Sequence, residues 1–145
     1  MQAYKRYKIS PEERIEAIGK ITAALENEEV VLFAYIYGSF CEEDGFNDID
    51  VAVYVDETTV KKEAFFDYQL GLAVRLEREL KRYPVDCRAL NIAPLSFRFS
   101  VITRGDLLYS NNEKERVSFE VMTRSLYLDF KPHAQFYYEN LVLGA

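Results

Sequence analysis

Two aspartates separated by a single residue are the side chains of this sequence best placed to do chemistry. Asp48 and Asp50 flank Ile49 at the start of an apolar segment that runs to Asp56. In an extended strand, residues two apart leave the same face, so these carboxylates lie close together. Such a pair repels unless a cation sits between its members. Because Mg²⁺ prefers carboxylate oxygens combined with phosphates and water, the spacing predicts a magnesium site.

A Gly-Ser pair ends the apolar segment that precedes these aspartates. Residues 30–37 (VVLFAYIY) are all apolar or aromatic, and a run of this length is typical of a strand covered on both faces. Gly38 ends the strand, because glycine adopts unusual backbone angles and lets a ligand approach the backbone. Ser39 adds a hydroxyl group, and donors in the turn can bind phosphate. With the short acidic loop that follows, these features predict a metal-assisted phosphate site.

A third aspartate lies within a later apolar segment, residues 85–90. An unpaired carboxylate in such a segment is expensive to bury. Asp86 therefore either faces water from an edge position or joins the other two aspartates as a metal ligand. Arg88 shares its face, and is expected to pair with an acidic side chain or to reach a nucleotide phosphate. Cys87 points the other way, into the core.

The remaining segments predict the elements that position these strands. Ser10 and Glu13, with Pro11 between them, form a capping box that starts a helix. Asp56 and the residues after it offer caps for a long helix that returns the chain to the same sheet. The predicted helices cover residues 11–26, 60–82, about 94–101, 113 to about 130 and 136–143, with Lys131-Pro132 ending the fourth, and the last strand covers 107–109.

The composition indicates a single domain spanning residues 1–145. A formal charge of −6 argues against a general nucleic-acid binder, which needs a basic face. No apolar run reaches the roughly 20 residues that span a bilayer, and the first ten residues lack a signal-peptide core, so we expect no membrane partner and a cytoplasmic location. Cys41, Cys87 and the single His133 make no zinc pattern, which leaves two free thiols.

The arrangement Gly38-Ser39, eight residues, then Asp48-x-Asp50 and an apolar strand resembles the GS…DxD signature of the DNA-polymerase-β-like nucleotidyltransferases. The small size resembles the minimal nucleotidyltransferase (MNT) branch, whose better-known members are antitoxins paired with HEPN ribonuclease toxins. Residues 90–110 (LNIAPLSFRFSVITRGDLLYS) are also similar to that branch. One difference is that the loop between the Gly-Ser pair and the aspartates is shorter than is usual in the family.

The order of the predicted elements indicates an α/β (α+β) fold with a small mixed sheet, helices on one face and at the sides, and the opposite face open as the site. The resemblance implies that this fold is of the polymerase-β type. It further implies that the three aspartates are catalytic and hold two Mg²⁺ ions when a nucleotide is bound, and that the other three site residues bind that nucleotide. The implied catalytic and metal-binding residues are Asp48, Asp50 and Asp86, and the implied nucleotide-binding residues are Gly38, Ser39 and Arg88.

The resemblance also implies a function, the transfer of AMP from ATP to a tyrosine of a cognate HEPN toxin, which makes the chain an antitoxin. Two alternatives stay open: an antitoxin that neutralises its partner by binding alone, and a nucleotidyltransferase acting on small molecules such as aminoglycosides. The apolar residues of the C-terminal helices, about 113–143, predict a partner-binding surface. Arg98 and Arg104 are candidates for phosphate or partner contacts, direct nucleic-acid binding is not expected, and self-association into a homo-oligomer stays open.

Overall fold

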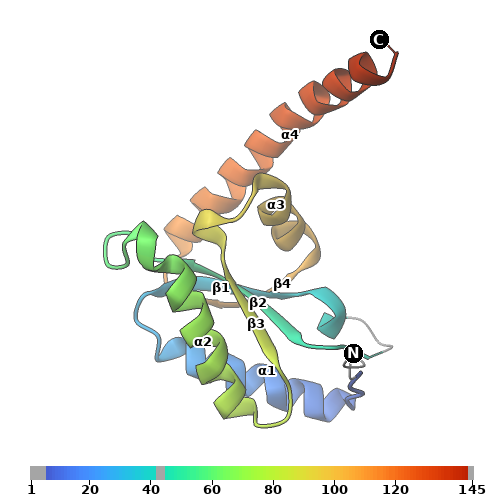
Figure 1. Cartoon of the computed structure of the whole chain (residues 1–145). Coiled ribbons are helices and arrows are strands. Elements are labelled where there is room, and N and C mark those ends of the chain that lie inside the picture. Colours follow the sequence, from blue (N-terminus) through green and yellow to red (C-terminus); the bar gives the residue numbers. More distant parts are fainter. Residues whose placement is uncertain (1–5, 42–44, 144–145) are drawn as a thin grey trace.

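A four-stranded mixed sheet lies at the centre of the chain (Figure 1). The computed structural model describes residues 6–41 and 45–143, and only the backbone of 131–143. The acidic loop predicted after the Gly-Ser turn lies partly outside these residues. The strands are β1 (Val31–Tyr37), β2 (Ile49–Val55), β3 (Val85–Ala89) and β4 (Asp106–Ser110), in the order β3-β2-β1-β4. All four predicted strands are confirmed.

The strand directions follow from the connections. β1 pairs antiparallel with both β2 and β4, whereas β2 and β3 run parallel. Parallel neighbours need a crossover, and α2 (Phe65–Leu80) supplies it. This helix begins later than predicted, because Asp56 does not cap it. The Asp56 carboxylate instead accepts hydrogen bonds from Thr58 and Thr59 in a separate turn before the helix.

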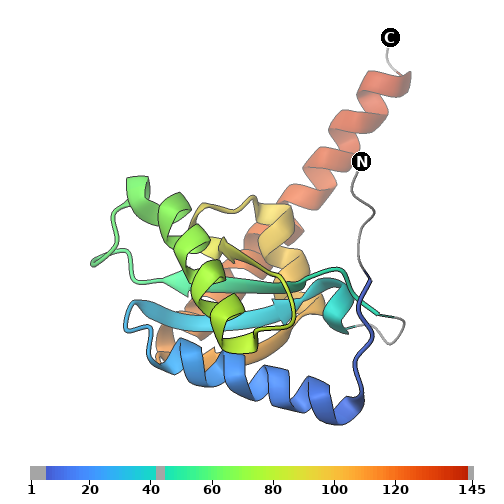
Figure 2. The same ribbon diagram turned by 60° about the horizontal axis from the view of Figure 1, so that its bottom comes forward.

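The first helix is the one predicted from its cap. α1 (Pro11–Glu26) starts with Ser10, whose hydroxyl accepts the Glu13 N–H, while the Glu13 carboxylate accepts the Ser10 N–H. This reciprocal pair satisfies two backbone donors that the first turn leaves open. The buried face of α1 packs against the sheet together with α2 (Figure 2).

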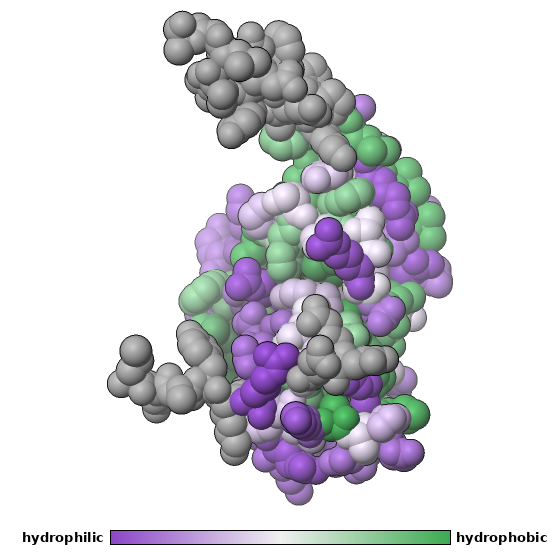
Figure 3. Space-filling model, turned by 90° about the vertical axis from the view of Figure 1, so that its right-hand side faces the viewer, coloured by the Kyte–Doolittle hydropathy of each residue, from purple (hydrophilic) through white to green (hydrophobic). Residues whose placement is uncertain are grey.

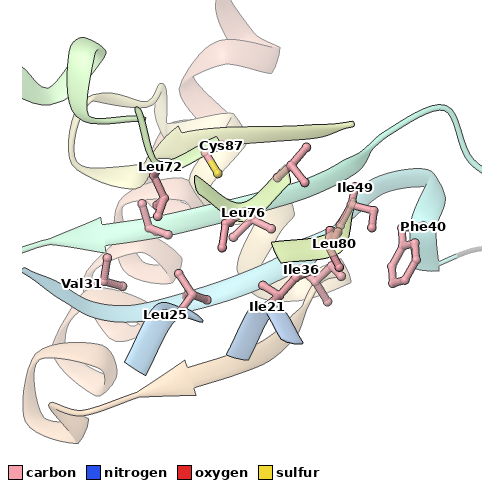
Figure 4. Packing of buried hydrophobic residues seen from close by; sticks show 14 of the residues in the cluster. Ile21, Leu25, Val31, Ile36, Phe40, Ile49, Leu72, Leu76, Leu80 and Cys87 are labelled. Carbon is pink, nitrogen blue, oxygen red and sulfur yellow. The ribbon is translucent and has the colours of Figure 1, made fainter. Parts of the chain in front are cut away.

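The core beneath α1 and α2 is continuous and apolar (Figure 4). Every second residue of β2 points into it, as the pleat of a strand requires. Leu72, Leu76 and Leu80 of α2 close it from above, and Cys87 of β3 is buried there as predicted. Neither Cys41 nor Cys87 forms a disulfide.

The opposite face of the sheet is also covered, which the sequence analysis did not expect. Phe33 and Tyr35 of β1 are buried there against α3 (Leu95–Arg104) and the first turns of α4 (Glu113–Leu143). A strand that is apolar on both faces needs cover on both. The prediction of one open face was therefore wrong over most of the sheet, although Tyr37 and Asp50, at the sheet end near Gly38, are only half-buried.

The C-terminal region is one helix, so the prediction of two helices divided at Pro132 was wrong. Proline removes one backbone hydrogen bond and crowds the preceding turn, at a cost of about 3 kcal/mol, but the turns on either side can still form. Beyond its first turns, α4 projects away from the rest of the chain (Figure 1). In the described ranges, no helix combines the length and apolar character that crossing a bilayer demands.

Candidate active site

Two neighbouring strands, β2 and β3, bring the predicted carboxylates together at one end of the sheet. Asp50 on β2 is the register partner of Tyr37 on β1 and of Asp86 on β3. Their sequence neighbours Ile49, Val51, Val85 and Cys87 are buried in the core beneath α1 and α2. Because side chains alternate along a strand, Asp50 and Asp86 face the opposite side, toward α3.

The Asp50 carboxylate lies against the backbone of Gly38. Gly38 ends β1, as predicted, and opens the short 3₁₀ turn η1 (Gly38–Cys41), which also contains Ser39. Its φ of +80° lies in the left-handed region that glycine tolerates best. A Cβ at this position would come within 2.3 Å of Asp50 Oδ2. Only glycine therefore permits this close approach between turn and carboxylate.

The surroundings of Asp50 favour its protonated form. Burial raises its pKa most, the negative charges of Asp48 and Asp86 raise it further, and a hydrogen bond with Asp48 adds to this, giving a pKa of about 7. Asp48 lies immediately before β2 and is half-buried. Asp48 and Asp50 are two neighbouring, half-buried carboxyl groups, and such a pair fits a Mg²⁺ ion that also keeps water and phosphate ligands.

Asp86 is the next carboxylate across the sheet, but it is paired with Arg88. Arg88 Nε lies 3.4 Å from Asp86 Oδ2, and the guanidinium lies over the Phe97 ring, 5.4 Å from its centroid. In the part of the chain that the structure describes, no three His, Cys, Asp or Glu side chains are already grouped as metal ligands. The structure thus brings Asp48 and Asp50 together and places Asp86 beside them, in an ion pair with Arg88.

Tyr37 is a site residue that the sequence analysis missed. It is the last residue of β1, and its ring packs edge-on against Phe97 at 5.4 Å between centroids. Burial, followed by the charges of Asp50 and Asp86, raises its pKa well above the ordinary value for tyrosine. Tyr37 therefore stays neutral and forms an aromatic wall beside the carboxylates. Its place just before Gly38, level with Asp50, was the signal that could have identified it.

A groove of about 500 Å³ opens beside the site, along the outer edge of β3. Asp86 and Arg88 line one side of it, so it is continuous with the carboxylate cluster. The rest of its lining is largely apolar and comes from α2, β3, the segment between β3 and α3, and the start of α3. Those lining residues are Phe66, Gln69, Leu70, Cys87, Ala89, Ile92, Ala93, Pro94 and Phe97.

The two other arginines singled out in the sequence do not join this cluster. Arg98 donates hydrogen bonds to the carbonyls of Asn91 and Ala93, at 3.1 and 2.9 Å. These bonds fix the segment between β3 and α3, so Arg98 has a structural role. Arg104 ends α3 with an exposed side chain. Neither residue lines the groove beside β3.

Solved structures share this fold over most of the chain. A MntA–HepT toxin–antitoxin structure matches with a TM-score of 0.65 and 24% identity, covering 88% of this chain and 98% of the other. A complex of a tri-AMPylated Shewanella oneidensis HEPN toxin with MNT antitoxin matches with a TM-score of 0.66 and 24% identity, covering 89% of this chain and 98% of the other. A toxin–antitoxin structure with AMP-PNP matches with a TM-score of 0.66 and 25% identity, covering 86% of this chain and 98% of the other.

A family model establishes the relationship at the level of sequence. The model described as polymerase beta, nucleotidyltransferase, matches residues 19–114, a range that includes the Gly-Ser turn and all three aspartates. No curated protein matches the chain. The matched range is more than half of the 145 residues, and the chain therefore belongs to the polymerase-β nucleotidyltransferase family.

Proposed function

We propose that this chain is an antitoxin of the MNT type that transfers AMP from ATP to a tyrosine of a HEPN toxin. The observation that carries the proposal is the Asp48–Asp50 pair, with Asp50 seated against Gly38 at the accessible end of the sheet. Membership of the nucleotidyltransferase family supports the reaction class. The likeness to solved MNT–HEPN complexes, in one of which the toxin is tri-AMPylated, supports the acceptor.

Each residue then has a role that follows from its position. Asp48 and Asp50 would hold Mg²⁺, with Asp86 completing the ligand set on the β3 side. Bound Mg²⁺ supplies positive charge to the triphosphate and lowers the pKa of the attacking hydroxyl. Gly38 and Ser39 would bind the β- and γ-phosphates through the backbone and hydroxyl donors of the turn.

Arg88 supplies the positive charge nearest to this cluster. Its guanidinium is mostly exposed and its ion pair with Asp86 is long, so the pair contributes little to stability. The side chain can therefore exchange its carboxylate partner for a nucleotide phosphate at low cost. We assign Arg88 to binding of the nucleotide, with Phe97 supporting the planar guanidinium from below.

Asp48→Asn tests the reaction directly. The variant keeps the size and shape of the side chain but loses the charge that holds the cation, so we expect AMP transfer to fall about 10³-fold. The measurement is the intact mass of a purified HEPN partner after incubation with ATP and Mg²⁺. Asp67→Asn, an exposed aspartate in the first turn of α2, is the matched control. Undiminished AMP transfer by Asp48→Asn would refute the site.

A second candidate function is neutralisation of the toxin by binding alone. The observation that favours it is the Asp86–Arg88 ion pair, which occupies the third carboxylate. This alternative predicts that Asp48→Asn still protects cells from the toxin, and that the mass of the toxin does not change when the wild-type chain is added with ATP. The wild-type chain and Asp48→Asn, compared in these two experiments, therefore separate the two functions.

A further inference from the structure

The groove beside β3 lies where the group that receives AMP must approach. We infer that this groove is the acceptor site and that it takes the aromatic side chain of a tyrosine presented by a protein partner. This inference rests on the proposed function. In the transfer, the tyrosine oxygen forms a bond to the α-phosphorus while the bond to the β-phosphate oxygen breaks. Pyrophosphate leaves, and the phenolic proton passes to a carboxylate or to water.

The order of residues across the sheet fixes the side from which the acceptor comes. Gly38 follows β1, Asp50 lies on β2, and Asp86 lies on the outer strand β3. Phosphoryl transfer needs the attacking and leaving oxygens roughly in line on opposite sides of phosphorus. With pyrophosphate held at the Gly38 turn, the attacking oxygen enters from the β3 side. The groove lies on that side, and Asp86 is one of the residues that line it.

The lining of the groove selects the chemistry of the acceptor. Phe66, Leu70 and Ile92 are large apolar side chains that are 60%, 52% and 42% exposed. Asp86 is the one acidic residue in the lining, and it already faces Arg88. A largely apolar groove with a single carboxylate in its lining suits an aromatic ring that carries one hydroxyl group. A polycationic aminosugar would require several carboxylates, so the lining argues against the aminoglycoside alternative.

The outer edge of β3 bears on whether the partner is recognised by strand addition or by a side chain. An edge strand can accept another strand through its unpaired backbone groups. Here the N–H groups of Val85 and Ala89 already donate to the side chains of Glu77 and Gln69, at 2.9 Å each. An incoming segment therefore cannot pair with those donors without displacing both side chains. We assign recognition to a side chain that enters the groove rather than to addition of a strand.

The test is Leu70→Glu compared with Val74→Glu, one turn further along α2. Both residues are about half exposed, at 52% and 48%, but only Leu70 lines the groove. With a HEPN partner as acceptor, Leu70→Glu should raise the KM for that protein at least tenfold and leave the KM for ATP unchanged. Val74→Glu should stay within twofold of the wild type. Ile92→Glu, on a different element, repeats the test if Leu70→Glu is unstable.

The outcomes separate this inference from the proposed function. If the wild-type chain transfers AMP and both groove variants match Val74→Glu, the acceptor site lies elsewhere while the proposed function stands. If the wild-type chain transfers no AMP to the HEPN partner, the proposed function fails and the acceptor site fails with it. Transfer of AMP to kanamycin in place of the protein would overturn the assignment of a phenolic acceptor.

Discussion

Gly38 determines how closely the Asp50 carboxylate approaches the backbone. We expect Gly38→Ala to lower the free energy of unfolding by about 2 kcal/mol, because the new Cβ meets Asp50 Oδ2 and the positive φ is strained for alanine. Displacement of Asp50 should lower AMP transfer about 100-fold. Urea denaturation and the mass assay measure these two effects.

Gly19→Ala provides the matched control for this substitution. Gly19 lies inside α1, and a Cβ there meets nothing within 4 Å. Alanine should therefore stabilise the chain by about 0.5–1 kcal/mol and leave AMP transfer unchanged. If both variants behaved alike, the close approach of Gly38 to Asp50 would have no role in activity.

The raised pKa of Asp50 predicts a pH-dependent stability when metal is removed. The unfolded chain loses the Asp50 proton near pH 4, whereas the folded chain keeps it up to about pH 7. Between these values the folded state binds more protons, so the free energy of unfolding falls as pH rises. Because Asp50 is only half-buried, we expect a loss of roughly 1–2 kcal/mol.

Thermal unfolding in EDTA at pH 5 and pH 8 measures this loss. Asp50→Asn, which cannot titrate, should show a smaller decrease in Tm between the two pH values than the wild type. Adding Mg²⁺ at pH 8 should raise the Tm of the wild type and not that of the variant. An equal decrease in both proteins would mean that Asp50 does not carry the raised pKa.

Some of the site could be predicted from single residues and some could not. The alternation of a strand is local, so it correctly placed Cys87 in the core, whereas Asp48 lies just before β2 and is next to Asp50 through a hydrogen bond. Tyr37 joins the site only through the register of β1 with β2, and no local pattern encodes that register. For Arg88 the sequence left open an acidic partner or a nucleotide phosphate, and in the structure it contacts Asp86, two residues away in its own strand.

At the scale of elements, side chains of α2 protect the free edge of β3. Glu77→Ala leaves the Val85 N–H without its 2.9 Å partner, and we expect a loss of about 1–2 kcal/mol in the free energy of unfolding. Glu79→Ala, at an exposed position on the same helix, should change it by less than about 0.5 kcal/mol. Chemical denaturation of both variants measures the difference. Equal stabilities would show that water satisfies this edge.

Capping patterns predicted the elements where the side chain and the backbone agree locally. Ser10 and Glu13 form the predicted box, and Asn112 accepts the Glu115 N–H at 3.1 Å at the start of α4. Asp56 failed as a cap because its carboxylate serves a nearer turn. Pro132 failed as a helix end because a proline costs one bond and some crowding, which a long helix can absorb.

For the whole molecule, α4 is anchored at its beginning and exposed further along. Phe119 packs against Phe33 and Tyr54, and the Tyr127 ring stacks on Phe99 at 3.8 Å between centroids. The helix also carries apolar side chains that contact solvent (Figure 3), namely Val117, Val121, Met122, Leu126, Leu128 and Phe130. Exposed apolar surface of this kind is typical of a protein interface.

We therefore expect Val121→Asp to weaken binding of the HEPN partner at least tenfold without lowering the Tm. Val121 is 57% exposed, so the charge costs little in the free chain but must be buried in a complex. Ile15→Asp, at a 72% exposed position on α1, is the control and should bind normally. Titration calorimetry measures both affinities. Unchanged binding by Val121→Asp would place the interface elsewhere.

The overall arrangement was predictable up to the placement of the last helices. The order of the elements and the parallel crossover followed from segment lengths and apolar patterns. That α3 and α4 cover the second face follows from Phe33 and Tyr35, which need burial, but which helix meets them depends on distant parts of the chain. Such long-range packing has no signature in a window of sequence.

The parallel pairing of β2 with β3 bears on how the protein folds. β1 and β2 can form a hairpin from neighbouring residues, but Asp86 reaches Asp50 only after the whole of α2 has docked. Pairings between distant segments form slowly, because the chain loses entropy before it gains contacts. We therefore expect the third carboxylate to arrive late in folding, so that a nascent or partly unfolded chain lacks the complete acidic cluster.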